Sequence, residues 1–273
     1  MTAATAQAGT PDDDLDALLA IATDLVRHAS DMALDPIGHL HLDGLQIDTK
    51  SDRNDLVTAV DRGIEDYMAN ELTARTGYGI LGEEGHTIDS FAGRVWVLDP
   101  IDGTMNYVQT HRDYAISLAL CQDGVPLIGI VADVVGAHLY TAIRGRGARC
   151  DGRLLPRVER DRGYRDSVLI TDLKEIRALP RLMACLEESR GHRRYGSAAL
   201  ECVEVACARA GGFVHMWVSP WDIAAATVIC QETGAVVTRL DGTPLDVRHK
   251  GSILAGSPQT HRELLQRLMA DPR

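Results

Sequence analysis

One apolar strand pattern ends on two carboxylates, and it constrains the fold more than any other feature of the chain. Val95–Leu98 predicts a buried strand, and Asp99 and Asp102 follow it directly. Pro100 stiffens the turn between the two acids, and Gly103-Thr104 can begin a helix whose free N–H groups would bind an anion. Because charged groups are costly inside an apolar interior, we expect the two acids to lie at the exposed end of this strand.

The carboxylate pair fits either a turn or a cation site. Asp-Pro and Asp-Gly are common turn dipeptides, so a structural role for Asp99 and Asp102 stays open. Unit charges about 4 Å apart repel by roughly 4 kcal/mol at an effective dielectric near 20. A bare pair would therefore bind protons or share cations. Oxygen ligands favour Mg²⁺, Mn²⁺ or Ca²⁺ over zinc.

Further acids stand where they could join that pair. Glu83 and Glu84 follow the preceding predicted strand, and strands that end at one sheet edge would bring Glu83 towards Asp99. Asp222 lies at a strand-to-helix junction, where its structural role would be a helix N-cap. Asp61 lies in an apolar stretch of a predicted helix, so it needs a hydroxyl or a metal-bound water as its partner.

Helical and strand patterns occur in both halves, which predicts a layered α/β architecture. We expect a disordered tail at residues 1–11, an N-terminal α+β part at 12–160 with a large antiparallel sheet and most metal ligands, and a C-terminal α/β part at 161–273 that carries Asp222. The predicted helices are 15–29, 55–75, 175–189, 197–210, 222–233 and 259–269. The predicted strands are 78–81, 95–98, three antiparallel runs within 114–143, 167–171, 213–218, 235–240 and 252–255.

Charge and composition limit the classes of partner. The formal net charge of -11 argues against binding to nucleic acid or to an anionic membrane, although cations can bridge an acidic protein to an anionic substrate. The six cysteines show no C-x-x-C pair and are expected to be buried thiols. The first residues show no signal-peptide pattern, and no apolar run reaches 18 residues. We therefore expect a cytoplasmic location.

Five motifs, taken in order, resemble the inositol monophosphatase family, a branch of the lithium-sensitive, Mg²⁺-dependent phosphatases, in a bacterial-type member. The motifs are Lys50-Ser51-Asp52 to Asp61, Gly82-Glu83-Glu84, Asp99 to Tyr107, Gly196 to Ala199, and Trp221-Asp222. The resemblance implies an αβαβα sandwich of the inositol monophosphatase/fructose-1,6-bisphosphatase type and a homodimer. It also implies hydrolysis of a small phosphorylated polyol or sugar, with inositol 1-phosphate as the first candidate. A fructose 1,6-bisphosphatase is the alternative enzyme, and a regulatory binding protein is the non-enzymatic alternative.

The same resemblance implies two to three Mg²⁺ ions, with Mn²⁺ as a possible replacement. Glu83, Asp99 and the backbone carbonyl of Ile101 would hold the first ion, and Glu83 with waters would hold a third. Asp99, Asp102 and Asp222 would hold the second. Paired metals of this kind clamp the attacking and leaving oxygens of an in-line displacement.

The resemblance also assigns roles around the substrate. The amides of Gly103 and Thr104 would bind the phosphate, and Asp102, Ser197 and Ala198 would also contact the substrate. Thr104 and Asp61 resemble the pair that orients and deprotonates the attacking water, because a threonine hydroxyl alone is too weak a base.

Four features stay open. Lys50 would lie on a loop that folds over the site, or be a solvated lysine, and Glu84 would support the ligands from behind. Animal relatives carry a glutamate six residues before the Trp-Asp pair, where this chain has His215. His215 would bind a different sugar or a second phosphate, or be a structural strand histidine. The basic run Arg190–Arg194 would meet an extra phosphate, lie in a dimer interface or form a solvated strand.

Overall fold

The computed structural model describes residues 11–39, 47–49 and 56–269 of the 273-residue chain. The helices in this part are α1 (Pro11–His39), α2 (Ala59–Thr76), α3 (Thr104–Gln109), α4 (Leu173–Ala178), α5 (Pro180–Glu188), α6 (Ala198–Ala206), α7 (Pro220–Glu232), α8 (Pro258–Met269) and the short 3-10 helix Tyr164–Asp166. Lys50 and the predicted tail lie outside the described residues, except that Pro11 already begins α1.

The strands form two larger sheets and one small pair within the described chain. The seven-stranded sheet has the order β3 (Gly79–Gly82), β4 (Arg94–Asp102), β5 (Ala115–Gln122), β6 (Val125–Asp133), β7 (His138–Ile143), β8 (Ala148–Cys150) and β9 (Arg153–Leu154). The five-stranded sheet has the order β11 (Gly191–Arg193), β10 (Val168–Thr171), β12 (Gly212–Val218), β14 (Gly251–Gly256) and β13 (Val236–Thr238). β1 (Ile47–Thr49) pairs with β2 (Leu56–Thr58).

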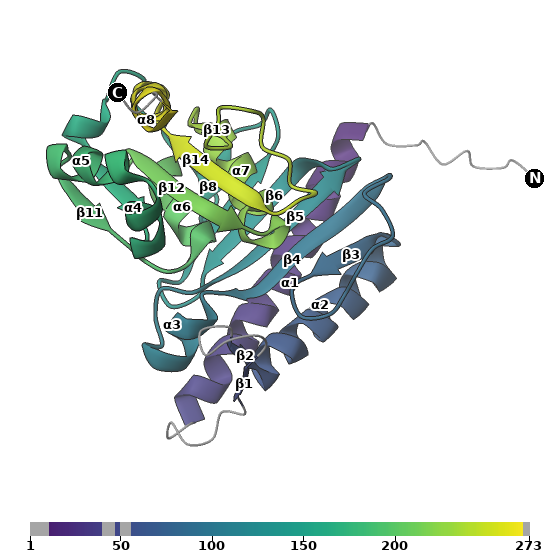
Figure 1. The fold of residues 1–273 in the computed structure, drawn as a ribbon. Coiled ribbons are helices and arrows are strands. Elements are labelled where there is room, and N and C mark those ends of the chain that lie inside the picture. Colours follow the sequence, from purple (N-terminus) through teal and green to yellow (C-terminus); the bar gives the residue numbers. More distant parts are fainter. Residues whose placement is uncertain (1–10, 40–46, 50–55, 270–273) are drawn as a thin grey trace, which may run out of the picture.

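Helices and sheets stack in five layers (Figure 1). α1 and α2 cover one face of the seven-stranded sheet, and α6 and α7 fill the space between that sheet and the five-stranded one. α5 and α8 pack on the outer face of the five-stranded sheet. This α–β–α–β–α order confirms the predicted layered sandwich.

The two faces of the large sheet carry different side chains, and this difference decides how closely the helices approach. Along β5, Ile116, Leu118 and Leu120 face α1 and α2, whereas smaller residues such as Ala119 face the middle helix layer. On β6 the middle layer comes closer still, because a Cβ at Gly129 would lie 2.2 Å from the carbonyl oxygen of Ala225. Small residues thus let α7 lie directly on the sheet.

Three predicted helix boundaries were wrong. Residues 56–58 pair with β1 as a strand, which suits the β-branched Val57-Thr58 better than the predicted helix start. The predicted helix 175–189 is two helices, because Pro180 has no N–H and disfavours helical geometry at Leu179. The predicted helix 197–210 ends at Ala206, and Ala208 then takes a left-handed φ of 58°.

The other predicted elements were confirmed to within a few residues, except that α1 continues ten residues beyond the predicted end at residue 29, to His39. The three antiparallel runs between Tyr114 and Ile143 are β5, β6 and β7, joined in sequence order. The basic run contains β11, the edge strand of the smaller sheet. His215 lies on β12, next to the point where the β12–β14 register shifts.

Candidate active site

A bulge in β4 places Asp99 and Asp102 on the same face of the large sheet. Asp99 pairs with Ser117 and Asp102 pairs with Ala115, and these partners are two residues apart on β5. Residues three apart in a regular strand face opposite ways, so the extra residue between the acids turns both to one side. Pro100 lies in this bulge, where its missing N–H breaks no ladder hydrogen bond.

The environment of Asp99 shows that five acids gather at this point. Asp99 is almost fully buried, and burial raises the pKa of its carboxyl well above the usual range. The negative charges of Glu83, Asp102, Asp222 and Asp61 raise that pKa further. β3 and β4 run parallel, which brings Glu83 to the same sheet edge as the sequence predicted.

Asp222 supports the start of α7 and also lies among the acids. The N-cap of α7 is Ser219 and not Asp222 as the sequence alternative had it; Asp222 lies in the first turn and completes a capping box, because its Oδ2 accepts a hydrogen bond from the N–H of Ser219 over 2.7 Å. Burial raises the pKa of Asp222, and the charges of Asp102 and Glu83 raise it further. The capping-box aspartate therefore also belongs to the acid cluster.

Asp61 lies in the first turn of α2 and is buried, as its apolar surroundings predicted. Thr104 begins α3 after Gly103, whose left-handed φ of 101° favours glycine. The Thr104 hydroxyl donates to the carbonyl oxygen of Ile101 over 3.2 Å. The proposed water-orienting residues thus come from two different elements at the edge of the large sheet.

The loop after β3 is held by Glu65, a residue that the sequence interpretation missed. Its buried carboxylate accepts hydrogen bonds from the backbone N–H groups of Glu84 (2.7 Å) and His86 (3.0 Å), and it contacts His86 Nδ1 at 2.9 Å. A Cβ at Gly82 would lie 2.4 Å from that carboxylate. Glu65 therefore fixes the loop that carries Glu83. The sequence signal that could have identified Glu65 is its position on the apolar face of α2, where a carboxylate needs polar partners.

Asp102 is held from the C-terminal half of the chain. Its Oδ2 accepts hydrogen bonds from the Ser197 hydroxyl and from the Ala199 N–H, both over 2.6 Å. Burial raises the pKa of Asp102 to about 6, although these hydrogen bonds oppose the change. Ser197 is fully buried and supports Asp102, whereas Ala198 faces the pocket, so of these two predicted substrate contacts only Ala198 lines it.

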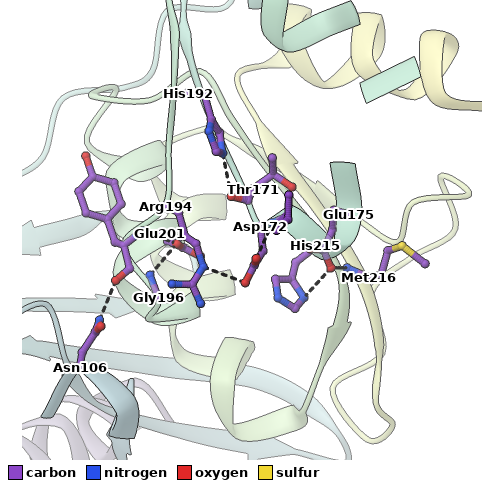
Figure 2. Close-up of polar contacts among 12 residues, drawn as sticks. Asn106, Thr171, Asp172, Glu175, His192, Arg194, Gly196, Glu201, His215 and Met216 are labelled. Carbon is purple, nitrogen blue, oxygen red and sulfur yellow. Dashed lines mark hydrogen bonds and ion pairs between the residues drawn. The ribbon is translucent and has the colours of Figure 1, made fainter. Parts of the chain in front are cut away.

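A second buried acid, Glu201, holds the loop before α6 and was also missed from the sequence. Its Oε1 accepts hydrogen bonds from the N–H groups of Tyr195 (2.7 Å) and Gly196 (2.9 Å). Asn106 of α3 donates to the carbonyl oxygen of Tyr195 over 2.6 Å, which ties the two halves together (Figure 2). Burial raises the pKa of Glu201 to about 7.

A pocket of about 220 Å³ opens beside these acids. Its inner end is formed by Asp102 and Asp222, and its outer wall carries Asp172, Arg194 and His215. Figure 2 shows these three outer side chains turned towards one another. The remaining lining residues are Gly196, Ala198, Glu201, Trp217 and Val218.

The inner end has the chemistry of a divalent-cation site. Several carboxylates share one partly buried space, and Lys250 is the cation whose charge opposes the raised pKa of Asp222. Oxygen donors of this kind fit Mg²⁺, Mn²⁺ or Ca²⁺. In the described residues, no three of these acids have side-chain oxygens that all lie within 4.8 Å of one another. The group that meets this distance is His138, Cys150 and Asp151, at the ends of β7 and β8.

A five-layer α/β sandwich with an acidic cation site next to a small pocket is the architecture of a metal-dependent phosphatase. The inositol monophosphatase family model matches residues 14–271, and the chain belongs to this family. It is therefore a phosphoric monoester hydrolase by family, and the predicted resemblance is confirmed.

Individual relatives carry different names. An inositol-1-monophosphatase of Bacillus subtilis (strain 168) is 38% identical over 232 residues, which are 82% of this chain and 87% of the relative. A protein named Nus factor SuhB, of Pasteurella multocida (strain Pm70), is 32% identical over 239 residues, 85% of this chain and 88% of the relative. A crystal structure of an IMPase/NADP phosphatase complexed with Mg²⁺ and phosphate has a TM-score of 0.84 and 26% identity, and covers 95% of this chain and 96% of that one.

Proposed function

We propose that this protein hydrolyses the phosphate monoester of a small polyol, with inositol 1-phosphate as the leading substrate and inositol and phosphate as products. The observation that carries the proposal is the buried cluster of acids around Asp99 at the inner end of the pocket. Such a cluster needs cations, and cations there would meet the phosphate of a bound ester.

The proposed metal ligands are acids of this cluster together with one backbone carbonyl. Glu83, Asp99 and the Ile101 carbonyl would hold one Mg²⁺, and Asp99, Asp102 and Asp222 would hold a second. A third ion would use Glu83 and waters, and Mn²⁺ would suit the same donors. When bound, these ions lower the pKa of a coordinated water and neutralise charge on the phosphate.

The chain's own groups would orient the reaction. The N–H groups of Gly103 and Thr104 point from the start of α3 and would donate to phosphate oxygens. Asp61 is the buried carboxylate that would bias the Thr104 hydroxyl to accept a proton from the attacking water. Glu84 donates its N–H to Glu65 and so supports the loop of Glu83.

An Asp99→Asn variant tests the proposal. With Mg²⁺ and inositol 1-phosphate, we expect phosphate release to fall by at least about 10²-fold, because the shared metal ligand loses its charge. Asp89→Asn is the matched control, since Asp89 lies on an exposed loop. Unchanged phosphate release from Asp99→Asn would refute the proposed active site.

A substrate panel separates the enzyme alternatives. Inositol 1-phosphate and fructose 1,6-bisphosphate are compared by kcat/KM, with Li⁺ added as a competitor of Mg²⁺. Comparable turnover of both esters would make the protein a general sugar phosphatase. A protein that releases no phosphate from any ester, yet binds a macromolecular partner, would have the regulatory function that the name of the Pasteurella relative describes.

Two accompanying proposals concern the assembly and the location. We expect a homodimer, which sedimentation of the purified protein measures, and a cytoplasmic location. In the described part of the chain, no helix combines the length and the apolar character that a membrane crossing requires.

A further inference from the structure

A second group of metal-ligand side chains lies at the ends of β7 and β8, away from the acids around Asp99. His138 begins β7, Cys150 ends β8, and Asp151 follows in the turn that leads to β9. One ligand atom from each of these three residues lies within 4.8 Å of the other two. Two strands, β5 and β6, separate β7 from β4, so the group shares no residue with the proposed Mg²⁺ site.

The backbone holds the three residues in place. Tyr140 pairs with Cys150 in the antiparallel β7–β8 ladder, and Asp151 takes a left-handed φ of 50° in the tight turn to β9. The Asp151 N–H donates to the Leu139 carbonyl oxygen over 2.9 Å, and the Leu139 N–H donates to Asp151 Oδ1, also over 2.9 Å. The backbone thus orients one carboxylate oxygen, which leaves Oδ2 facing His138 and Cys150.

The distances in this group are close to those between the ligands of one small cation. Asp151 Oδ2 lies 2.9 Å from His138 Nδ1 and 3.5 Å from the Cys150 sulfur. Zinc bonds of about 2.0–2.1 Å to nitrogen or oxygen and about 2.3 Å to sulfur, at tetrahedral angles, place neighbouring ligand atoms roughly 3.3–3.6 Å apart. The carboxylate and the thiol already have this separation, and the carboxylate and the imidazole need to open by only roughly 0.4 Å.

The donor set selects a softer ion than Mg²⁺. Mg²⁺ prefers oxygen ligands, whereas thiolate sulfur and imidazole nitrogen favour Zn²⁺ and similar transition metals. The acids around Asp99 offer oxygen alone, so the two sites would select different ions. The side chains of His138 and Asp151 are 51% and 47% exposed, which lets an ion enter from solvent.

A cavity of about 430 Å³ adjoins two of the three ligands. Its lining includes His138 and Asp151, two further carboxylates, Asp31 and Asp133, and one cationic side chain, Arg27. The excess of carboxylates gives this surface a negative potential, which attracts a cation. Three protein ligands leave one tetrahedral position for water, as in zinc sites that stay open to exchange.

We propose that His138, Cys150 and Asp151 form a second metal site that binds Zn²⁺ or a similar soft divalent ion, independently of the Mg²⁺ ions of the proposed function. Binding releases the thiol proton to solvent and joins the start of β7 to the turn after β8. Backbone hydrogen bonds already form this hairpin without the ion, so the ion binds reversibly to the folded protein and stabilises it.

Co²⁺ absorption tests the site in the full-length protein, with excess Mg²⁺ to occupy the acids around Asp99. Co²⁺ bound to a thiolate gives a sulfur-to-metal charge-transfer band in the near ultraviolet, which oxygen ligands do not give. We expect this band in the native protein and its loss in a Cys150→Ser variant. Cys207→Ser is the matched control and should keep the band, because Cys207 is the other partly exposed cysteine and does not belong to the group.

Zn²⁺ competition against the Co²⁺ band measures the affinity. We expect a His138→Gln variant to raise the Kd for Zn²⁺ at least about tenfold, because the ion loses its nitrogen ligand. Zn²⁺ should also raise the melting temperature of the native protein more than that of Cys150→Ser. Circular dichroism shows that each variant is folded.

The site and the proposed active site fail separately. A folded native protein without the band would refute the metal site, and so would a band that persists in Cys150→Ser or disappears in Cys207→Ser. Phosphate release with Mg²⁺ reports the active site, and it should be the same in Cys150→Ser as in the native protein.

Discussion

Glu65 lies on α2 with its carboxylate buried, and its role is to hold the loop that follows β3. Two backbone N–H groups and the His86 ring surround its carboxylate. A buried carboxylate is costly without such partners, and the loop gains a fixed conformation from them. Gly82 is the residue that lets the carboxylate approach the backbone so closely.

A Gly82→Ala variant therefore tests the positioning of Glu83. The added Cβ would lie 2.4 Å from the Glu65 carboxylate, so the loop or Glu65 must move. We expect the free energy of unfolding to fall by about 1–3 kcal/mol and the Mg²⁺ concentration for half-maximal activity to rise. Urea unfolding and Mg²⁺ titration measure the two effects. Gly85→Ala is the control, because its Cβ would meet no atom within 4 Å, and an equal effect there would contradict this role.

At the scale of elements, α7 carries Asp222 to the end of β4 because it lies so close to the large sheet. The contact depends on Gly129 of β6, where the backbone carbonyl of Ala225 occupies the space of a side chain. Ser117 of β5 adds a hydrogen bond to the Trp221 carbonyl over 3.0 Å. The position of Asp222, the proposed metal ligand, is thus a consequence of helix-on-sheet packing.

A Gly129→Ala variant should force α7 away from the sheet. The Cβ would meet backbone, which cannot rotate aside as a side chain can, so we expect a loss of about 2–3 kcal/mol in the free energy of unfolding and a weaker response to Mg²⁺. By contrast, Gly63→Ala on α2 meets open space and should stabilise the protein by about 0.5–1 kcal/mol. Denaturant unfolding compares the two, and similar midpoints would show that the packing is not tight.

For the whole molecule, the acid cluster makes stability depend on both pH and metal. Burial and neighbouring carboxylates raise the pKa of Asp99, Asp102 and Asp222, that of Asp102 to about 6. An unfolded aspartate titrates near 3.9. The metal-free folded state therefore binds more protons than the unfolded state between these values, so its stability falls as pH rises through them.

Metal removal should therefore matter most at the higher pH. With a chelator, we expect a lower melting temperature at about pH 7.5 than at about pH 5. Mg²⁺ at 100 times its Kd stabilises by about 2.7 kcal/mol, and it binds the ionised carboxylates, so its effect should be large at the higher pH and small at the lower. Scanning calorimetry measures both. Asp102→Asn should flatten the pH dependence, and a Mg²⁺ effect equal at both pH values would argue against the cluster as the metal site.

Much of the site could be predicted because its residues lie at the ends of strongly patterned elements. The turn signals around Gly103 and the junction before Asp222 are local features, and the structure places both where their patterns indicated. The apolar run before Asp99 is a strand as predicted, but the strand continues through Asp102, so Pro100 lies in a bulge of β4 and not in a turn after it. Helix ends were less predictable, because Pro180 divides one periodic pattern and Ala208 ends another by a backbone turn.

The sequence by itself determined which residues could bind a cation and at which strand and helix ends they would lie, because strand and helix periodicity and turn chemistry are local. Only the tertiary structure decided which distant groups support them. Ser197 meets Asp102 across 95 positions, and Arg194 meets Asp172 across 22. Such pairs form because layers stack and bury charge, which no local pattern records, and they define the pocket in which the ester's leaving group would lie.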